Sequence, residues 1–295
     1  MEVPTKNRSV SRVIQAVRTT EGDGVPIRRL FPTRALADLD PFLLLDEMGP
    51  LELAAGSHTG FPDHPHRGFE TVTYVLDGEM EHRDSHGNHG IIGPGDVQWM
   101  TAGAGLVHSE MPGSELQRKG GRLHGFQLWV NLPRRDKMVR PQYQGLLGSR
   151  IPAASDEVGR VQVRIIAGES LGGRALIQTH TPIAYLHFTL QPGGESVQNV
   201  PRGWNAFAYV IEGKVDPGAG SDPVRAGQAA LFSRDGDSVM LANRSARAAS
   251  LLLISGEPLG EPVARYGPFV MNTREELVQA AEDFRSGRMG AIALR

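Results

Sequence analysis

The sequence predicts an all-β protein of two β-domains in tandem, each a sandwich or a barrel, with one helix packed on the outside near the C-terminus. Short runs of alternating or β-branched residues recur along the 295-residue chain, and turns rich in glycine and proline separate them. One segment is repeated, because 68–78 reads GFETVTYVLDG and 203–213 reads GWNAFAYVIEG. This internal similarity indicates two copies of one β-domain.

The order of the strand-like runs supports this division. The runs lie at 69–76, 90–100, 125–132, 161–166, 185–190, 204–211 and 250–254. Each copy of the repeat precedes a second turn-and-strand unit, GPGDVQWM at 93–100 and RAGQAALF at 225–232. The junction near 133–155 is rich in proline and glycine, as linkers often are. We therefore expect an N-terminal domain at 1–140 and a C-terminal domain at 141–295.

A single helix is predicted close to the C-terminus. Thr273 and Glu276 form a capping-box pattern, and an apolar stripe from Leu277 to Phe284 follows. Gly287 is a typical helix stop. We expect this helix to pack on the outside of a barrel and to belong to the C-terminal domain.

Composition excludes several classes of function. The chain has no cysteine, so disulfides, thiolate zinc sites and cysteine nucleophiles are ruled out. The formal net charge of −2 gives no sign of binding to nucleic acid or to an anionic membrane. The first residues lack the apolar core of a signal peptide, and no apolar run is long enough to span a bilayer. We expect a cytoplasmic protein.

Two pairs of side chains have the spacing of metal ligands. His64 and His66 are two residues apart, as are His108 and Glu110. In a strand, side chains at this spacing share one face. If the two pairs meet inside a barrel, they provide three imidazoles and one carboxylate for a single ion. These ligand types leave iron, nickel, manganese, cobalt, copper and zinc open.

The spacing resembles the two motifs of the cupin superfamily. The His64–His66 pair, followed by Glu70 and Gly78, is similar to the first motif with one extra residue in its spacer. The stretch from Gly103 to His108 is similar to the second motif, with glycine where that motif has proline.

Longer strings resemble the pirin family. They are FPDHPHRGFETVTYVL at 61–76, GDVQWMTAGAGLVHSEMP at 95–112, LWVNLP at 128–133, GEPLGEPV at 256–263 and GPFVMNT at 267–273. Pirins are bicupins with a metal in the N-terminal barrel only, so the resemblance implies two cupin (jelly-roll-like) β-barrels in tandem. The resemblance implies an Fe(2+) site formed by His64, His66, His108 and Glu110. In the second repeat, Asn199 and Pro201 stand opposite His64 and His66, so we expect no metal there.

Other residues have competing interpretations. Glu70 is the alternative to Glu110 as the carboxylate ligand, or it orients a ligand. Arg67 and Asp63 either hydrogen-bond a ligand ring or form a surface ion pair. We expect a core or surface role for His124. His82, His86 and His89 cluster around a predicted hairpin turn, and we expect them to be solvated. Phe69, Trp99 and Met100 either line the wall of a hydrophobic pocket or pack in the core, and we expect core packing.

The resemblance implies quercetin 2,3-dioxygenase activity on a small aromatic substrate with O2. The metal would acidify the flavonol 3-hydroxyl, Glu110 would accept its proton, and ring opening would release carbon monoxide. The alternative is a redox-sensing regulator that binds a transcription factor or a metabolic enzyme. A third interpretation is a zinc isomerase or sugar-binding cupin without redox chemistry.

Overall fold

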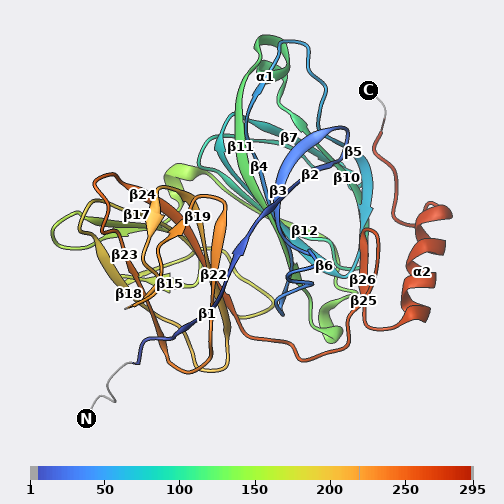
Figure 1. Cartoon of the computed structure of the whole chain (residues 1–295). Coiled ribbons are helices and arrows are strands. Elements are labelled where there is room, and N and C mark those ends of the chain that lie inside the picture. The colour runs from blue at the N-terminus through green and yellow to red at the C-terminus, as the bar shows by residue number, and fades with distance from the viewer. Residues whose placement is uncertain (1–5, 219, 294–295) are drawn as a thin grey trace. The chain divides into compact units, whose positions relative to one another are not determined.

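The computed structural model describes residues 6–218 and 220–293, which form two compact units (Figure 1). The unit that we call the first barrel contains 18–32, 42–150 and 259–293. The unit that we call the second barrel contains 6–17, 33–41 and 151–258. Both are built mainly from strands, so the prediction of two β-barrels in one all-β chain is confirmed.

The chain ends are grouped differently from the predicted division at 140/141. The N-terminal strand adds to a sheet of the second barrel, where Val13 pairs with Ala230. The C-terminal segment with its helix belongs to the first barrel instead. The barrel to which each end segment belongs is determined by the strand or hairpin that it contacts. Those contacts are far away in the sequence, and no local pattern in the sequence identifies them.

The first barrel has a seven-stranded sheet in the order β12-β9-β6-β11-β4-β3-β2 and a four-stranded sheet in the order β5-β10-β7-β8. Its strands are β2 (Val17–Glu21), β3 (Val25–Phe31), β4 (Phe42–Leu53), β5 (Phe61–His66), β6 (Phe69–Asp77), β7 (Met80–Asp84), β8 (His89–Ile92), β9 (Val97–Thr101), β10 (Leu106–Pro112), β11 (Gly121–Asn131) and β12 (Gln142–Leu146), with the hairpin β25 (Ala264–Tyr266) and β26 (Phe269–Met271). Short helices are α1 (Ser114–Lys119), η1 (Arg134–Asp136) and η2 (Gly148–Arg150).

The second barrel has a seven-stranded sheet in the order β1-β22-β19-β24-β17-β14-β13 and three two-stranded sheets, β18-β23, β15-β16 and β20-β21. Its strands are β1 (Val10–Gln15), β13 (Ala153–Ser155), β14 (Val161–Ala167), β15 (Glu169–Ser170), β16 (Gly173–Arg174), β17 (Ile183–Leu190), β18 (Glu195–Asn199), β19 (Asn205–Glu212), β20 (Lys214–Val215), β21 (Val224–Arg225), β22 (Gln228–Phe232), β23 (Ser238–Ala242) and β24 (Ala249–Gly256).

The repeat in the sequence is a repeat in the topology. The central order β9-β6-β11-β4-β3 of the first barrel matches β22-β19-β24-β17-β14 of the second. In each copy the repeated strand pairs with the strand of the following turn unit, as Val72 does with Trp99 and Ala208 with Ala230. The two barrels are thus copies of one strand arrangement.

Side-chain alternation explains how polar groups reach the interior of the first barrel. In β7, Met80, His82 and Asp84 are buried, whereas Glu81 and Arg83 are partly exposed. This two-residue period is that of a strand with one face turned inward. Histidines and carboxylates on inward faces therefore lie among apolar neighbours.

The predicted C-terminal helix is α2 (Arg274–Arg285), and its capping box is confirmed. The backbone N–H of Glu276 donates to Thr273 Oγ1 at 3.2 Å, and that of Thr273 donates to Glu276 Oε2 at 3.0 Å. Figure 1 shows α2 alongside the β25–β26 hairpin, and Ala280 packs against Phe269. Among the described residues, no helix is long and apolar enough to cross a membrane.

Candidate metal centre

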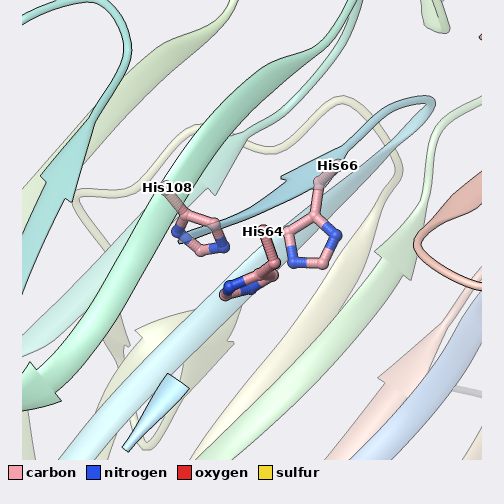
Figure 2. Close-up of side chains that lie close together, drawn as sticks. All are labelled: His64, His66 and His108. Carbon is pink, nitrogen blue, oxygen red and sulfur yellow. The ribbon is translucent and has the colours of Figure 1, made fainter. Parts of the chain in front are cut away.

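Three histidines from two neighbouring strands converge inside the first barrel. His64 and His66 lie on β5, and His108 lies opposite His64 on the antiparallel strand β10. The centroids of the three rings are 4.3–4.8 Å apart. One ring nitrogen from each histidine lies within 4.8 Å of the others, and Figure 2 shows the three side chains pointing toward one another.

The ring nitrogens are arranged as metal ligands require. His64 Nδ1 donates to the carbonyl of Pro62 at 2.7 Å, and His66 Nδ1 donates to that of Pro268 at 3.4 Å. These hydrogen bonds leave Nε2 of both rings with a lone pair. His66 Nε2 and both nitrogens of His108 are buried and have no hydrogen-bond partner among the described residues. Buried polar atoms of this kind need a partner, and a transition-metal ion fits them.

Burial keeps the imidazoles of His66 and His108 in the neutral form that binds metals. It lowers the pKa of His66 well below its ordinary value, and the nearby His64 lowers it further. Burial likewise lowers the pKa of His108, with smaller contributions from the neighbouring histidines. Since a protonated ring has no free lone pair, both shifts favour metal binding.

The predicted carboxylate is close to the histidines but is held by other residues. Glu110 is 2% exposed and lies outside the group of three histidines. Thr73 Oγ1 donates to Glu110 Oε1 at 2.7 Å, and Gln127 Nε2 donates to Oε2 at 2.7 Å. The alternative, Glu70, also lies outside that group and accepts a hydrogen bond from Thr101 at 2.7 Å.

Arg67 and His124, which the sequence singled out, have structural partners. Arg67 is buried, donates to the carbonyl of Ala104 and forms an ion pair with Asp283 of α2 at 2.7 Å. His124 is a core histidine, hydrogen-bonded to Glu47 at 2.8 Å. Phe69, Trp99 and Met100 are buried core residues, as expected.

The sequence reasoning missed the role of His82, which it treated as a solvated loop residue. His82 is 1% exposed, and its ring lies 5.3 Å from that of His108. The hydroxyl of Tyr143 lies 3.2 Å from His82 Nε2. The two-residue spacing of Met80, His82 and Asp84 was the available signal, because side chains at this spacing share one face of a strand, and all three are buried in β7.

A cavity of about 570 Å³ opens beside the histidines. His64 and His66 border it, together with Phe61, Trp129 and Arg265. The guanidinium of Arg265 lies over the ring of Trp129, 4.9 Å from its centroid. The volume of the cavity is within the range of about 300–1,000 Å³ that is typical of small-molecule sites. The first barrel therefore combines a candidate metal centre with room for an organic ligand.

Comparison with known proteins identifies the family. The family model "Pirin" matches residues 24–130, and the model "Pirin C-terminal cupin domain" matches residues 185–290. The chain belongs to the pirin family. It is 46% identical to a pirin-like protein of Solanum lycopersicum over 286 residues, which are 97% of this chain and 94% of that protein. It is 45% identical to human pirin over 287 residues, 96% of this chain and 94% of that protein.

A solved structure extends the comparison. The structure of a quercetin 2,3-dioxygenase from Acinetobacter baumannii matches this pirin-family chain with a TM-score of 0.90 and 37% identity. The match covers 98% of this chain and all of that one. The two-cupin architecture is therefore shared over nearly the whole chain.

In this pirin-family chain, the turn after the histidine pair gives a testable prediction. Gly68 has a φ of +88°, and an added Cβ would lie 1.9 Å from the carbonyl oxygen of Val270. Gly68→Ala should lower the free energy of unfolding by about 3 kcal/mol, from left-handed strain and overpacking together. Gly203, its counterpart in the repeat, has a φ of +92° but open space around it, so Gly203→Ala should cost only about 1 kcal/mol. Denaturant unfolding measures both, and equal losses would contradict the close contact.

Proposed function

We propose that the chain is a metal-dependent dioxygenase that opens the ring of a quercetin-type flavonol with O2 and releases carbon monoxide. The observation that carries the proposal is the cavity of about 570 Å³ that reaches His64 and His66. The similarity to a structure named quercetin 2,3-dioxygenase also supports it. In this proposal one iron(II) ion is held by His64, His66, His108 and Glu110.

The four proposed ligands differ in whether their ligand atoms are already engaged in hydrogen bonds. The three imidazoles already converge, and the buried nitrogens of His66 and His108 have no other described partner. Glu110 follows His108 by two residues on β10, but both of its oxygens accept hydrogen bonds. It would act as a ligand or as a base by exchanging one of these bonds.

The surrounding residues suit a planar phenolic substrate. When bound, the ion would supply Lewis-acid chemistry that makes the flavonol 3-hydroxyl more acidic. Trp129 offers an aromatic wall, and Gln127 both lines the cavity and donates to Glu110. Glu110 is therefore one hydrogen bond from the cavity, where it would accept the hydroxyl proton. Both atoms of O2 would enter the product ester, and one ring carbon would leave as carbon monoxide.

The open cavity favours this function over that of a sensor that binds only proteins. A regulator that signals the state of its metal through the surface does not need space for an organic ligand beside the metal. Here His64 is only half-buried and the cavity reaches the cluster. A small-molecule substrate explains that space directly.

The test begins with protein loaded with iron(II) without oxygen. Quercetin is added, oxygen is then admitted, and carbon monoxide and oxygen consumption are measured together. Equal amounts of oxygen consumed and carbon monoxide released would support the proposal. A fully loaded protein that releases no carbon monoxide would refute the dioxygenase assignment for this substrate.

Replacement of the proposed base gives a sharper prediction. Glu110→Gln should lower turnover at least ~100-fold, because a positioned base contributes about 10²–10⁴-fold. Most of the metal should remain, since the three imidazoles are untouched. The matched control is Glu70→Gln, another buried glutamate bonded to a threonine, which should retain activity. Unchanged turnover in Glu110→Gln, measured by carbon monoxide release and metal content, would remove Glu110 as the base.

A further inference from the structure

The second barrel contains a larger cavity, of about 890 Å³. Its lining includes Ala184 of β17, Ser255 of β24 and residues 197–201 from the end of β18 onward. Asn199 and Pro201 stand in the repeat where the first barrel has His64 and His66. The second barrel has thus kept a cavity at the position of the candidate metal centre but lines it with different chemistry.

A buried arginine fixes one wall of this cavity. Arg8 is 2% exposed, and its guanidinium donates to the carbonyls of Trp204 and Pro201 at 2.7 Å each. It also donates to the carbonyls of Gly236 at 3.3 Å and Val200 at 3.5 Å. Burying a charge is unfavourable unless it is fully hydrogen-bonded, so this arrangement holds the 200–204 segment in one conformation. A preorganised wall reduces the ordering cost of binding a ligand.

Another part of the cavity lining has an unusual backbone conformation. Leu171, in the turn of the β15–β16 hairpin, has a φ of +46° and is the only non-glycine residue with positive φ among those described. The side chain of Leu171 is 43% exposed and lines the cavity. Strained positions of this kind concentrate at ligand sites. The turn therefore places a partly exposed apolar side chain in the cavity lining, where an apolar ligand surface could cover it.

The interior polar groups are ordered and uncharged. Gln198 Nε2 donates to the carbonyls of Glu169 and Asn199 at 3.0 and 3.1 Å, and its Oε1 accepts from Ser170 at 2.7 Å. Trp204 packs on the apolar core of the barrel and also lines the cavity, so it can offer an aromatic surface to a ligand.

The charged residues of the lining are exposed to solvent or hydrogen-bonded within the barrel. Glu169 and Arg174 are exposed, carry opposite charges and stand at paired backbone positions of the β15–β16 hairpin. Asp237 accepts hydrogen bonds from the backbone N–H of Lys6 at 2.7 Å and from Arg202 at 3.0 Å. No described charge in the lining therefore requires an ionic ligand, and a neutral one fits best.

We propose that the second barrel binds an uncharged aromatic compound carrying hydroxyl groups, in the cavity between Trp204 and Leu171. The ring would stack on Trp204 and contact Leu171 and Val197. The hydroxyl groups would pair with the Asn199 amide and the Ser255 hydroxyl. This site needs no metal and does not depend on the activity proposed for the first barrel.

Equilibrium dialysis of the metal-loaded full chain against quercetin, without oxygen, tests the proposal. The wild type should bind two molecules per chain. Val197→Trp fills the cavity from a position that is 49% exposed, so the fold should tolerate it and one molecule should be lost. The control is Val13→Trp, a valine of the same barrel that is 47% exposed and outside the cavity, which should still bind two.

A milder variant tests how much the side chain of Leu171 contributes to the affinity. Leu171→Asn keeps a residue that tolerates positive φ but removes the apolar contact, so the affinity of the second site should fall about tenfold. Binding that Val197→Trp leaves unchanged would overturn the proposal. If methyl glucoside displaces the quercetin molecule that is lost in Val197→Trp, the assignment of an aromatic ligand would be overturned. If only the first-barrel proposal fails, the wild type binds one molecule and Val197→Trp binds none.

Discussion

His108→Ala should abolish stoichiometric metal binding, with a loss of affinity greater than ~100-fold. Replacing a residue that merely supports a ligand already costs about 10–100-fold, and His108 is expected to be a ligand itself. Both of its ring nitrogens are buried without a described partner, and it is the only histidine of the cluster that comes from β10. Metal content after anaerobic reconstitution and dialysis measures the effect.

Two further variants make this result specific. His64→Ala should also lose the metal, and because His64 is only half-buried its removal should leave the fold intact. His86→Ala removes an exposed histidine of the β7–β8 turn and should bind metal as the wild type does. Full metal occupancy in both His64→Ala and His108→Ala would refute the three-histidine centre.

Lys137→Met should lower the free energy of unfolding by about 4 kcal/mol. Lys137 is 2% exposed, and its ammonium donates to Asn131 Oδ1 at 2.7 Å and to the carbonyls of Gly68 at 2.8 Å and Val270 at 3.0 Å. These hydrogen bonds join the turn before β6, the end of β11 and the β26 strand. Methionine fills similar space but leaves three buried acceptors without this donor, each worth about 1–3 kcal/mol. Denaturant titration measures the loss.

The pH dependence of this difference provides a second readout. Burial lowers the pKa of Lys137 from 10.5 to about 8. Between these values the unfolded chain holds a proton that the folded chain has released, so the stability of the wild type relative to Lys137→Met should rise as pH rises from 8 to 10.5. The control Lys119→Met removes an exposed lysine and should change stability by less than ~1 kcal/mol. A Lys137→Met loss as small as that of Lys119→Met would contradict the proposed stabilising role of Lys137.

Features encoded by neighbouring residues could be predicted from the sequence. The repeated strands, the capping box of α2 and the paired spacing of His64 and His66 all depend on residues a few positions apart. Strand periodicity converts such spacing directly into a shared face. The convergence of three histidines followed once the two histidine-bearing strands were paired.

Features that depend on distant pairing could not be predicted. The assignment of the chain ends, the hydrogen bonds of Glu110 and the approach of Tyr143 to His82 join residues up to hundreds of positions apart. A hydrogen-bond partner such as Pro268 for His66 has no local signature in the sequence, because any backbone carbonyl can take that role.

The grouping of the chain ends also determines when the histidine cluster can be completed. The ribosome releases His64, His66 and His108 long before the last segment, which carries Arg265 and Pro268, yet these late residues line the same cavity and hold His66 in place. Strand β1 must likewise wait for β22 to be made. Neither barrel is built from one continuous half of this sequence, so the cavity beside the histidines is complete only after residues 265–268 have been made.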